Sequence, residues 1–127
     1  MLQFQSCNTN IPATVTRTIP LKRALAPGRL ERASWCQELD ADGTKTVKIR
    51  NATKGVDLTA ALDIAALGAQ DSAEFVLTST VGDLDVRKGD LLTLVYTVTV
   101  AGAVAPGDCG VMMAIRHGKS GEPNDLP

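Results

Sequence analysis

The sequence predicts an all-β fold, a single sandwich or barrel of short strands with one short helix. Side chains alternate between apolar and polar along several segments, which places successive residues on opposite faces of a strand. Hydrophobic residues make up 44% of the chain but aromatic residues only 3%, so the core must be built mainly from aliphatic side chains. Glycine-containing turn sequences separate the alternating segments at short intervals, as is typical of sandwiches and barrels.

The clearest strand covers residues 92–100, where aliphatic residues and Tyr96 occupy one face and mostly threonines occupy the other. Ala33 and Trp35 share one face of a second strand, and Val111, Met113 and Ile115 form a last inward row. Pro20 lacks a backbone N–H, so its strand is expected at a sheet edge. The strands expected besides 92–100 are 14–21, 29–38, 46–50, 75–81 and 111–115.

Residues 57–68 do not alternate. Asp57 is a suitable N-cap, alanine and leucine follow, and Gly68 is a suitable stop, so we expect a short helix across one end of the strands. A chain of 127 residues has room for one domain. We divide it into an N-terminal arm (1–16), a β-sandwich domain (17–117) and a flexible C-terminal tail (118–127) rich in Gly, Pro, Ser and Asn.

Composition and charge favour a soluble protein with protein partners. The formal net charge is −1, which gives no overall field to attract nucleic acid or an anionic membrane. The longest uncharged run, 91–107, is interrupted by threonines and Pro106 and is too short for a membrane span. The first residues do not resemble a secretory signal, so we expect synthesis in the cytoplasm. Three widely spaced cysteines predict reduced thiols, with Cys36 buried.

No pattern of catalytic, cofactor-binding or metal-binding residues is found, and we expect no enzymatic activity. The single histidine, His117, follows the last strand, where an exposed residue at a strand end is expected rather than a general base. The run from Asp40 to Gly43 resembles the start of an EF-hand loop, but the glutamate at position twelve is lacking and turn chemistry explains it better. Lys88, Gly89 and Asp90 likewise form an ordinary turn before a strand.

Two stretches are candidates for protein contact. Residues 1–16 carry no charge and include the apolar Leu2, Phe4 and Ile11, so this arm could add to the sheet edge of a neighbouring subunit. A basic stretch follows, and it is expected either to contact an acidic protein surface or to be a solvated face. Its basic residues are Arg17, Lys22, Arg23, Arg29 and Arg32.

The order of turns and strands resembles a known group of phage proteins. The segments that carry the resemblance are 25–30, 47–55, 57–64 and 86–94, of which the turn from Lys88 to Asp90 before a long strand is the most distinctive. They are similar to jelly-roll decoration (cement) proteins, which bind the outside of tailed-bacteriophage heads. The resemblance covers residues 11–116 and implies a jelly-roll-like antiparallel β-sandwich.

The resemblance also implies a function without chemistry. It predicts a structural virion protein on the outer capsid surface, made in the host cytoplasm, that bridges subunits of the major capsid protein. It predicts a homo-oligomer, a dimer or trimer, with no cofactor, no nucleic acid and no membrane partner. The alternatives are a tail or baseplate accessory protein and a carbohydrate- or receptor-binding jelly roll. The last would be expected to have clustered aromatic residues, and this chain has four in all.

Overall fold

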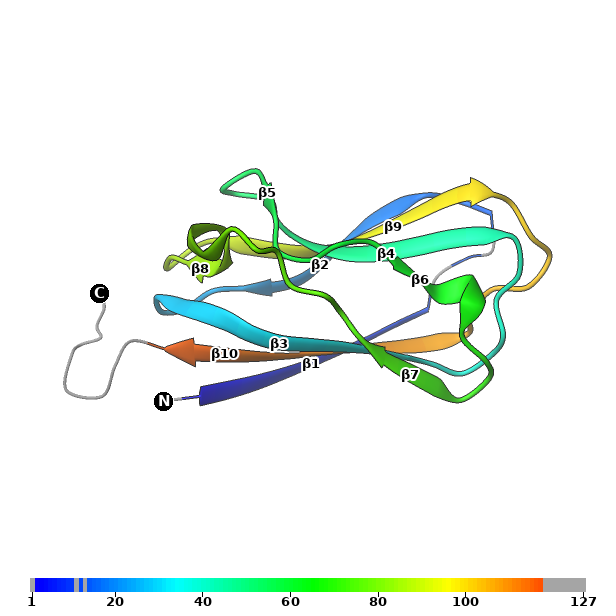
Figure 1. Cartoon of the computed structure of the whole chain (residues 1–127), viewed down its shortest axis with the longest axis horizontal. Coiled ribbons are helices and arrows are strands. Elements are labelled where there is room, and N and C mark those ends of the chain that lie inside the picture. Colours follow the sequence, from blue (N-terminus) through cyan, green and yellow to red (C-terminus); the bar gives the residue numbers. More distant parts are fainter. Residues whose placement is uncertain (1, 11, 13, 118–127) are drawn as a thin grey trace.

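Two antiparallel sheets stack face to face and form a β-sandwich (Figure 1). The computed structural model describes the backbone of residues 2–10 and describes residues 12 and 14–117 in full. The first sheet contains β1 (Leu2–Asn10), β10 (Asp108–His117), β3 (Gly28–Gln37), β7 (Asp71–Glu74) and β8 (Asp85–Val86). The second contains β2 (Arg17–Arg23), β9 (Leu91–Val100), β4 (Thr44–Asn51), β5 (Val56–Asp57) and β6 (Leu62–Asp63). The fold class predicted from the sequence is confirmed.

The strands pair in a nested order. The first strand, β1, pairs with the last, β10, and β2 pairs with β9. Inside these, β3 pairs with β7 and β8, and β4 pairs with β5 and β6. The chain therefore resembles one long hairpin folded across two sheets, with the pairs β1–β10 and β3–β7/β8 in the first sheet and β2–β9 and β4–β5/β6 in the second, which is the topology of a jelly roll.

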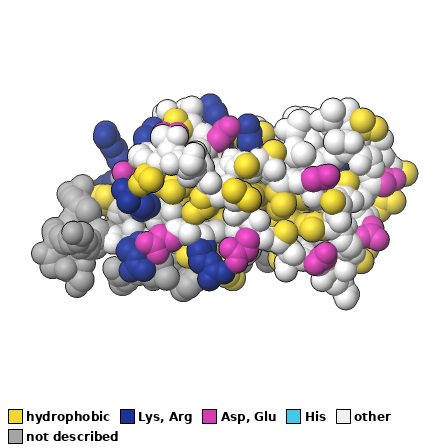
Figure 2. Space-filling view, viewed as in Figure 1, with side chains coloured by type: hydrophobic (Ala, Val, Ile, Leu, Met, Phe, Trp, Pro, Cys, Tyr) yellow, Lys and Arg dark blue, Asp and Glu magenta, His cyan; other side chains and the backbone are white. Residues whose placement is uncertain are grey.

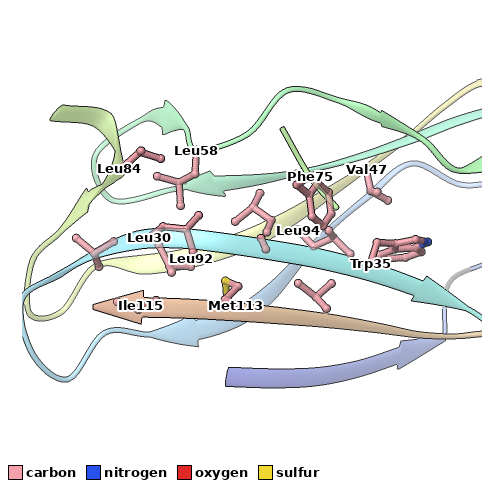
Figure 3. Close-up of a cluster of buried hydrophobic side chains, with 14 of the residues drawn as sticks. Leu30, Trp35, Val47, Leu58, Phe75, Leu84, Leu92, Leu94, Met113 and Ile115 are labelled. Carbon is pink, nitrogen blue, oxygen red and sulfur yellow. The ribbon is translucent and has the colours of Figure 1, made fainter. Parts of the chain in front are cut away.

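The core lies between the two sheets and is built by alternation along four long strands. In the first sheet, Trp35 on β3 is in register with Val111 on β10, and both face the second sheet. In the second sheet, Ile49 on β4 is in register with Leu94 on β9, and both are fully buried. Figure 3 shows these rows of side chains pointing toward one another from the two layers.

Three of the strands predicted by alternation, those over 46–50, 92–100 and 111–115, are present with longer bounds, and the strand predicted over 29–38 is shifted by one residue to Gly28–Gln37. The segment expected over 14–21 forms β2 from Arg17. The strand expected over 75–81 is not found. Phe75 and Leu77 do face the core, but the segment leaves the first sheet after β7, bonds to residues between β5 and β6, and returns to the first sheet at β8. Figure 1 shows this path along one side of the sandwich. Phe75 N donates to Ala33 O on β3 of the first sheet. Val76 O accepts from Ala60 N, which lies between β5 and β6 of the second sheet. This segment closes one side of the sandwich. The residues that do form a strand here are those just before it, in β7.

The helix expected over 57–68 is reduced to one 3-10 turn, η1 (Ile64–Ala66). Its N-cap is Asp63 rather than Asp57, and the Asp63 carboxylate accepts from Ala65 N. The preceding residues form β5, a bridge between Thr59 and Leu77, and β6. Pairing with β4 provides these residues with backbone partners that a helix would otherwise supply within itself. A second 3-10 turn, η2 (Val81–Leu84), precedes β8.

The N-terminal segment expected to be an arm is, over Leu2–Asn10, the edge strand of the first sheet of its own chain. Pairing with β10 continues through nine consecutive residues without a bulge. Ile11 and the tail 118–127 lie outside the described residues, as do the side chains of Leu2 and Phe4.

Gln37 is a buried polar residue whose hydrogen bonds connect β3 to two turns at one end of the sandwich. Its side chain is 3% exposed and occupies an inward position at the end of β3. The Gln37 Oε1 atom accepts from Trp35 Nε1 at 2.9 Å, and its Nε2 donates to the carbonyl oxygens of Leu39 and Ile64 at 3.0 and 3.3 Å. A single amide therefore joins the core tryptophan, the turn after β3 and the 3-10 turn η1.

We predict that Gln37→Leu lowers the free energy of unfolding by about 1–3 kcal/mol, because it leaves the Trp35 N–H and backbone carbonyls buried without partners. Chemical denaturation followed by tryptophan fluorescence measures this change. The matched control is Cys36→Ser on the neighbouring, exposed position of β3, which should change stability by no more than about 0.5 kcal/mol. Equal losses in the two variants would show that the Gln37 contacts do not stabilise the fold.

Candidate contact surfaces

The five basic residues predicted as a contact stretch are divided between the two sheets. Arg17, Lys22 and Arg23 lie on β2, the edge strand of the second sheet. Arg29 and Arg32 lie on β3 in the interior of the first sheet. The stretch therefore does not form one continuous basic patch.

The two arginines of the first sheet are paired with carboxylates of the same chain. Arg29 Nε lies 2.7 Å from an Asp85 carboxylate oxygen, and Arg32 forms an ion pair with Glu74. On the next strand, Arg116 Nε lies 2.7 Å from Glu31. The hydrogen bond to its carboxylate raises the pKa of each arginine. Exposed pairs of this kind contribute little to stability because solvent and salt screen them, so their main effect is to neutralise charge on this face.

The outer face of the first sheet carries a shallow depression of about 170 Å³ between β3, β7 and β10. Its lining consists of Arg32, Ala33, Ser34, Glu74, Met112 and Ala114. Met112 is 47% exposed, so an apolar side chain and an ion pair lie side by side. Neither Met112 nor Glu74, the carboxylate partner of Arg32, was predicted from the sequence, because the pairing of β3 with β7 and β10 is not visible in local patterns.

The basic residues of the second sheet differ in their surroundings. Arg17 and Arg23 are exposed, and neither forms an ion pair with a described residue. Arg23 Nη1 donates to the backbone carbonyl of Gly89 at 2.7 Å, which holds the side chain near the turn before β9. Positive charge on β2 is thus less compensated than on the first sheet.

Charge is also divided along the length of the molecule. Figure 2 shows Lys and Arg side chains gathered toward the end that carries β5 and β8, where Asp and Glu side chains lie among them, whereas mostly Asp and Glu side chains are seen at the opposite end. The acidic residues of that end include Glu38, Asp40 and Asp42 after β3, Asp63 at the end of β6 and Asp71 at the start of β7. The two ends of the sandwich therefore present different surfaces to a partner.

Asp42 belongs to the run that resembles an EF-hand start, and its carboxylate is used within the fold. Its two oxygens accept from Ala103 N at 3.1 Å and Val104 N at 2.8 Å, and Lys45 Nζ lies 3.5 Å away. These backbone hydrogen bonds, aided by Lys45, lower the pKa of Asp42. Asp42 therefore joins the turn after β3 to the loop between β9 and β10.

Asp90, in the turn from Lys88 to Asp90, is also structural. It is buried, and its Oδ2 accepts from Asn51 Nδ2 and from Arg87 N, both at 2.9 Å. Its backbone carbonyl accepts from Ala24 N at 2.8 Å. Through its carboxylate and its backbone carbonyl, Asp90 thus connects its own turn to Asn51 at the end of β4 and to Ala24 after β2, and its buried side chain is not displayed for recognition by a partner.

Two of the cysteines, Cys36 and Cys109, and the single histidine have described side chains. Cys36 and Cys109 are free thiols, but Cys36 is exposed rather than buried as expected, because it alternates with the inward Trp35 and Gln37. Burial is the main cause that raises the pKa of Cys109 to about 12, so this thiol stays protonated at neutral pH. His117 lies at the end of β10, half-buried, with Nδ1 3.0 Å from the carbonyl oxygen of Pro27.

The described residues include no group of three or more His, Cys, Asp or Glu side chains placed to share a metal ion. Within the same part of the chain, no helix has the length and apolar character needed to cross a membrane.

Comparison with known proteins relates the chain to one solved structure through its fold. A chain of the cyanophage Pam1 capsid asymmetric unit superposes with a TM-score of 0.65 at 12% sequence identity. The match covers 91% of this chain and 84% of the Pam1 chain. No protein-family model matches the sequence, and no curated protein matches it. The two chains therefore share a fold over nearly their whole lengths.

We predict that Asp42→Asn destabilises the protein at neutral pH and that the difference from the wild type disappears in acid. A carboxylate with a lowered folded-state pKa contributes stability above its unfolded value of about 3.9 and loses that contribution as the pH falls through the folded value. Denaturation midpoints from pH 7 to pH 2 measure the effect. A pH-independent difference between the two proteins would contradict the assignment.

Proposed function

We propose that this chain is a non-enzymatic structural virion protein that decorates a phage capsid and stabilises it by bridging major capsid protein subunits. The observation that carries the proposal is the match to a chain of a phage capsid asymmetric unit over nearly the whole of both chains. The coverage means that the Pam1 chain is about as long as this one. The likeness is therefore between two small single-domain chains and does not concern one part of a larger shell protein.

A small sandwich can stabilise a shell without any chemistry. A protein that binds the assembled lattice but not free subunits shifts the equilibrium toward the assembled state. Many copies on a repeating lattice add their contributions, so each contact can be modest.

The β2 edge is the part of the basic stretch that best suits an acidic capsid surface. Arg17 and Arg23 are exposed there without carboxylate partners among the described residues. Arg29 and Arg32 would first have to give up Asp85 and Glu74. Uncompensated charges at the rim of an interface increase association rates and make binding sensitive to salt. We therefore place the capsid contact on β2, with Lys22 between the two arginines.

We predict that the double variant Arg17→Gln/Arg23→Gln binds phage heads lacking this protein about tenfold more weakly than wild type, a loss of ~1.4 kcal/mol. Binding of the wild type should weaken as salt rises, and the variant should show a shallower salt dependence. Co-sedimentation of the purified protein with such heads gives both quantities. Heating the same heads measures stabilisation, because decorated heads should rupture at a higher temperature.

The matched control is Arg29→Gln/Arg32→Gln, which removes the same two charges from the first sheet. Its affinity should stay within about threefold of the wild type, since its arginines are already neutralised by Asp85 and Glu74. A stronger loss in this control would move the contact to the first sheet. Absence of binding to heads by the wild type would overturn the decoration proposal, and binding to purified tails instead would favour a tail or baseplate protein.

A further inference from the structure

The four outer edges of the two sheets are protected to different degrees. In the second sheet, β2 carries Arg17, Pro20, Lys22 and Arg23, and its pairing with β9 is interrupted by a register shift between Pro20 and Lys22. The opposite edge of that sheet consists of the two-residue strands β5 and β6. In the first sheet, one edge consists of the short β7 and β8. Charges, proline, irregular pairing and short strands are the usual features that prevent an edge from pairing with another chain.

The remaining edge, β1, has none of these features. It is nine residues long, and its sequence from Leu2 to Asn10 contains no charged residue and no proline. Its pairing with β10 shows no register shift, so the strand is regular along its length. β1 has a strand neighbour on one side, β10, and ends the described sheet on the other. The backbone groups that face away from β10 are therefore positioned to form a second ladder.

We propose that β1 is a homodimer interface, at which the β1 strands of two copies pair antiparallel and join the two first sheets into one continuous sheet. A second copy is the occupant that this strand suits best. Two identical strands related by a two-fold axis repel each other when they carry charge, and this strand carries none. Such a contact is isologous, so it closes after two subunits instead of growing into a fibre.

The dimer would leave the proposed capsid contact accessible. β1 and β2 are edge strands of different sheets, so a partner strand on β1 does not take the place of a partner on β2. The inference concerns the isolated protein and does not depend on the capsid proposal. It gives the N-terminal segment a role in joining subunits while its nine residues remain paired with β10 of their own chain.

Charge at the centre of β1 tests the proposal. Ser6 is in register with Met112, which is exposed on the outer face of the sheet, so a charged residue at this position is compatible with the fold. Sedimentation over a concentration series should show a monomer–dimer equilibrium for the wild type, and Ser6→Lys and Ser6→Glu should each be monomeric. An equimolar mixture of the two variants should restore a dimer, because opposite charges then meet near the two-fold axis.

The matched control is Thr18→Lys on β2, an exposed position on the other long edge strand, which should dimerise like the wild type. Circular dichroism establishes that all variants are folded. Hydrogen exchange adds a local readout: alternate amides of β1, those facing away from β10, should become protected only as the dimer forms. A wild type that stays monomeric at its highest soluble concentration, or a dimer lost in Thr18→Lys but kept in Ser6→Lys, would overturn the proposal.

Discussion

The alternation of inward and outward residues along β3, β4, β9 and β10 is the constraint on which the rest of this structure depends. With so few aromatic residues in the chain, the space between the sheets is filled by aliphatic rows that must meet in register. A shift of one residue in any of these strands would turn its apolar row to solvent. Both features of the outer surface, the ion pairs of the first sheet and the charged edge of β2, follow from that register.

Among the described side chains, three buried polar residues lie at or next to the ends of long strands. Gln37 closes β3, and Lys45 and Asn51 lie at the two ends of β4, all three almost fully buried. Each finds partners in the turns: Gln37 in carbonyls near η1, Lys45 in Asp42, and Asn51 in Asp90. A buried amide or ammonium is favourable only when it is satisfied in this way, so these residues fasten the loops onto the sandwich. Both ends of the molecule are consequently held by side chains, which gives any contact surface there a defined shape.

Local patterns predicted the class of fold and the long strands, but not the features that need knowledge of distant pairing. Trp35 and Met113 were assigned correctly to inward faces because alternation alone determines a face. The segment 75–81 alternates equally well, yet Phe75 and Val76 bond to different sheets, which no local signal reveals. The ion pairs of Arg29 and Arg32 were missed for the same reason, since Asp85 and Glu74 lie 56 and 42 residues away. The basic stretch is continuous in sequence but divided in space, because the jelly-roll path carries the chain from β2 in the second sheet to β3 in the first.

We propose that this sandwich is an accessory protein of a phage head, and its location in the parent particle tests that proposal. A reconstruction of the parent particle by electron microscopy would show where the chain lies at a resolution sufficient to recognise two stacked sheets. We expect density for this fold at regular, multi-copy positions on the outer surface of an icosahedral head, in contact with more than one major capsid protein subunit. Density in the tail, or a particle without this chain, would contradict it.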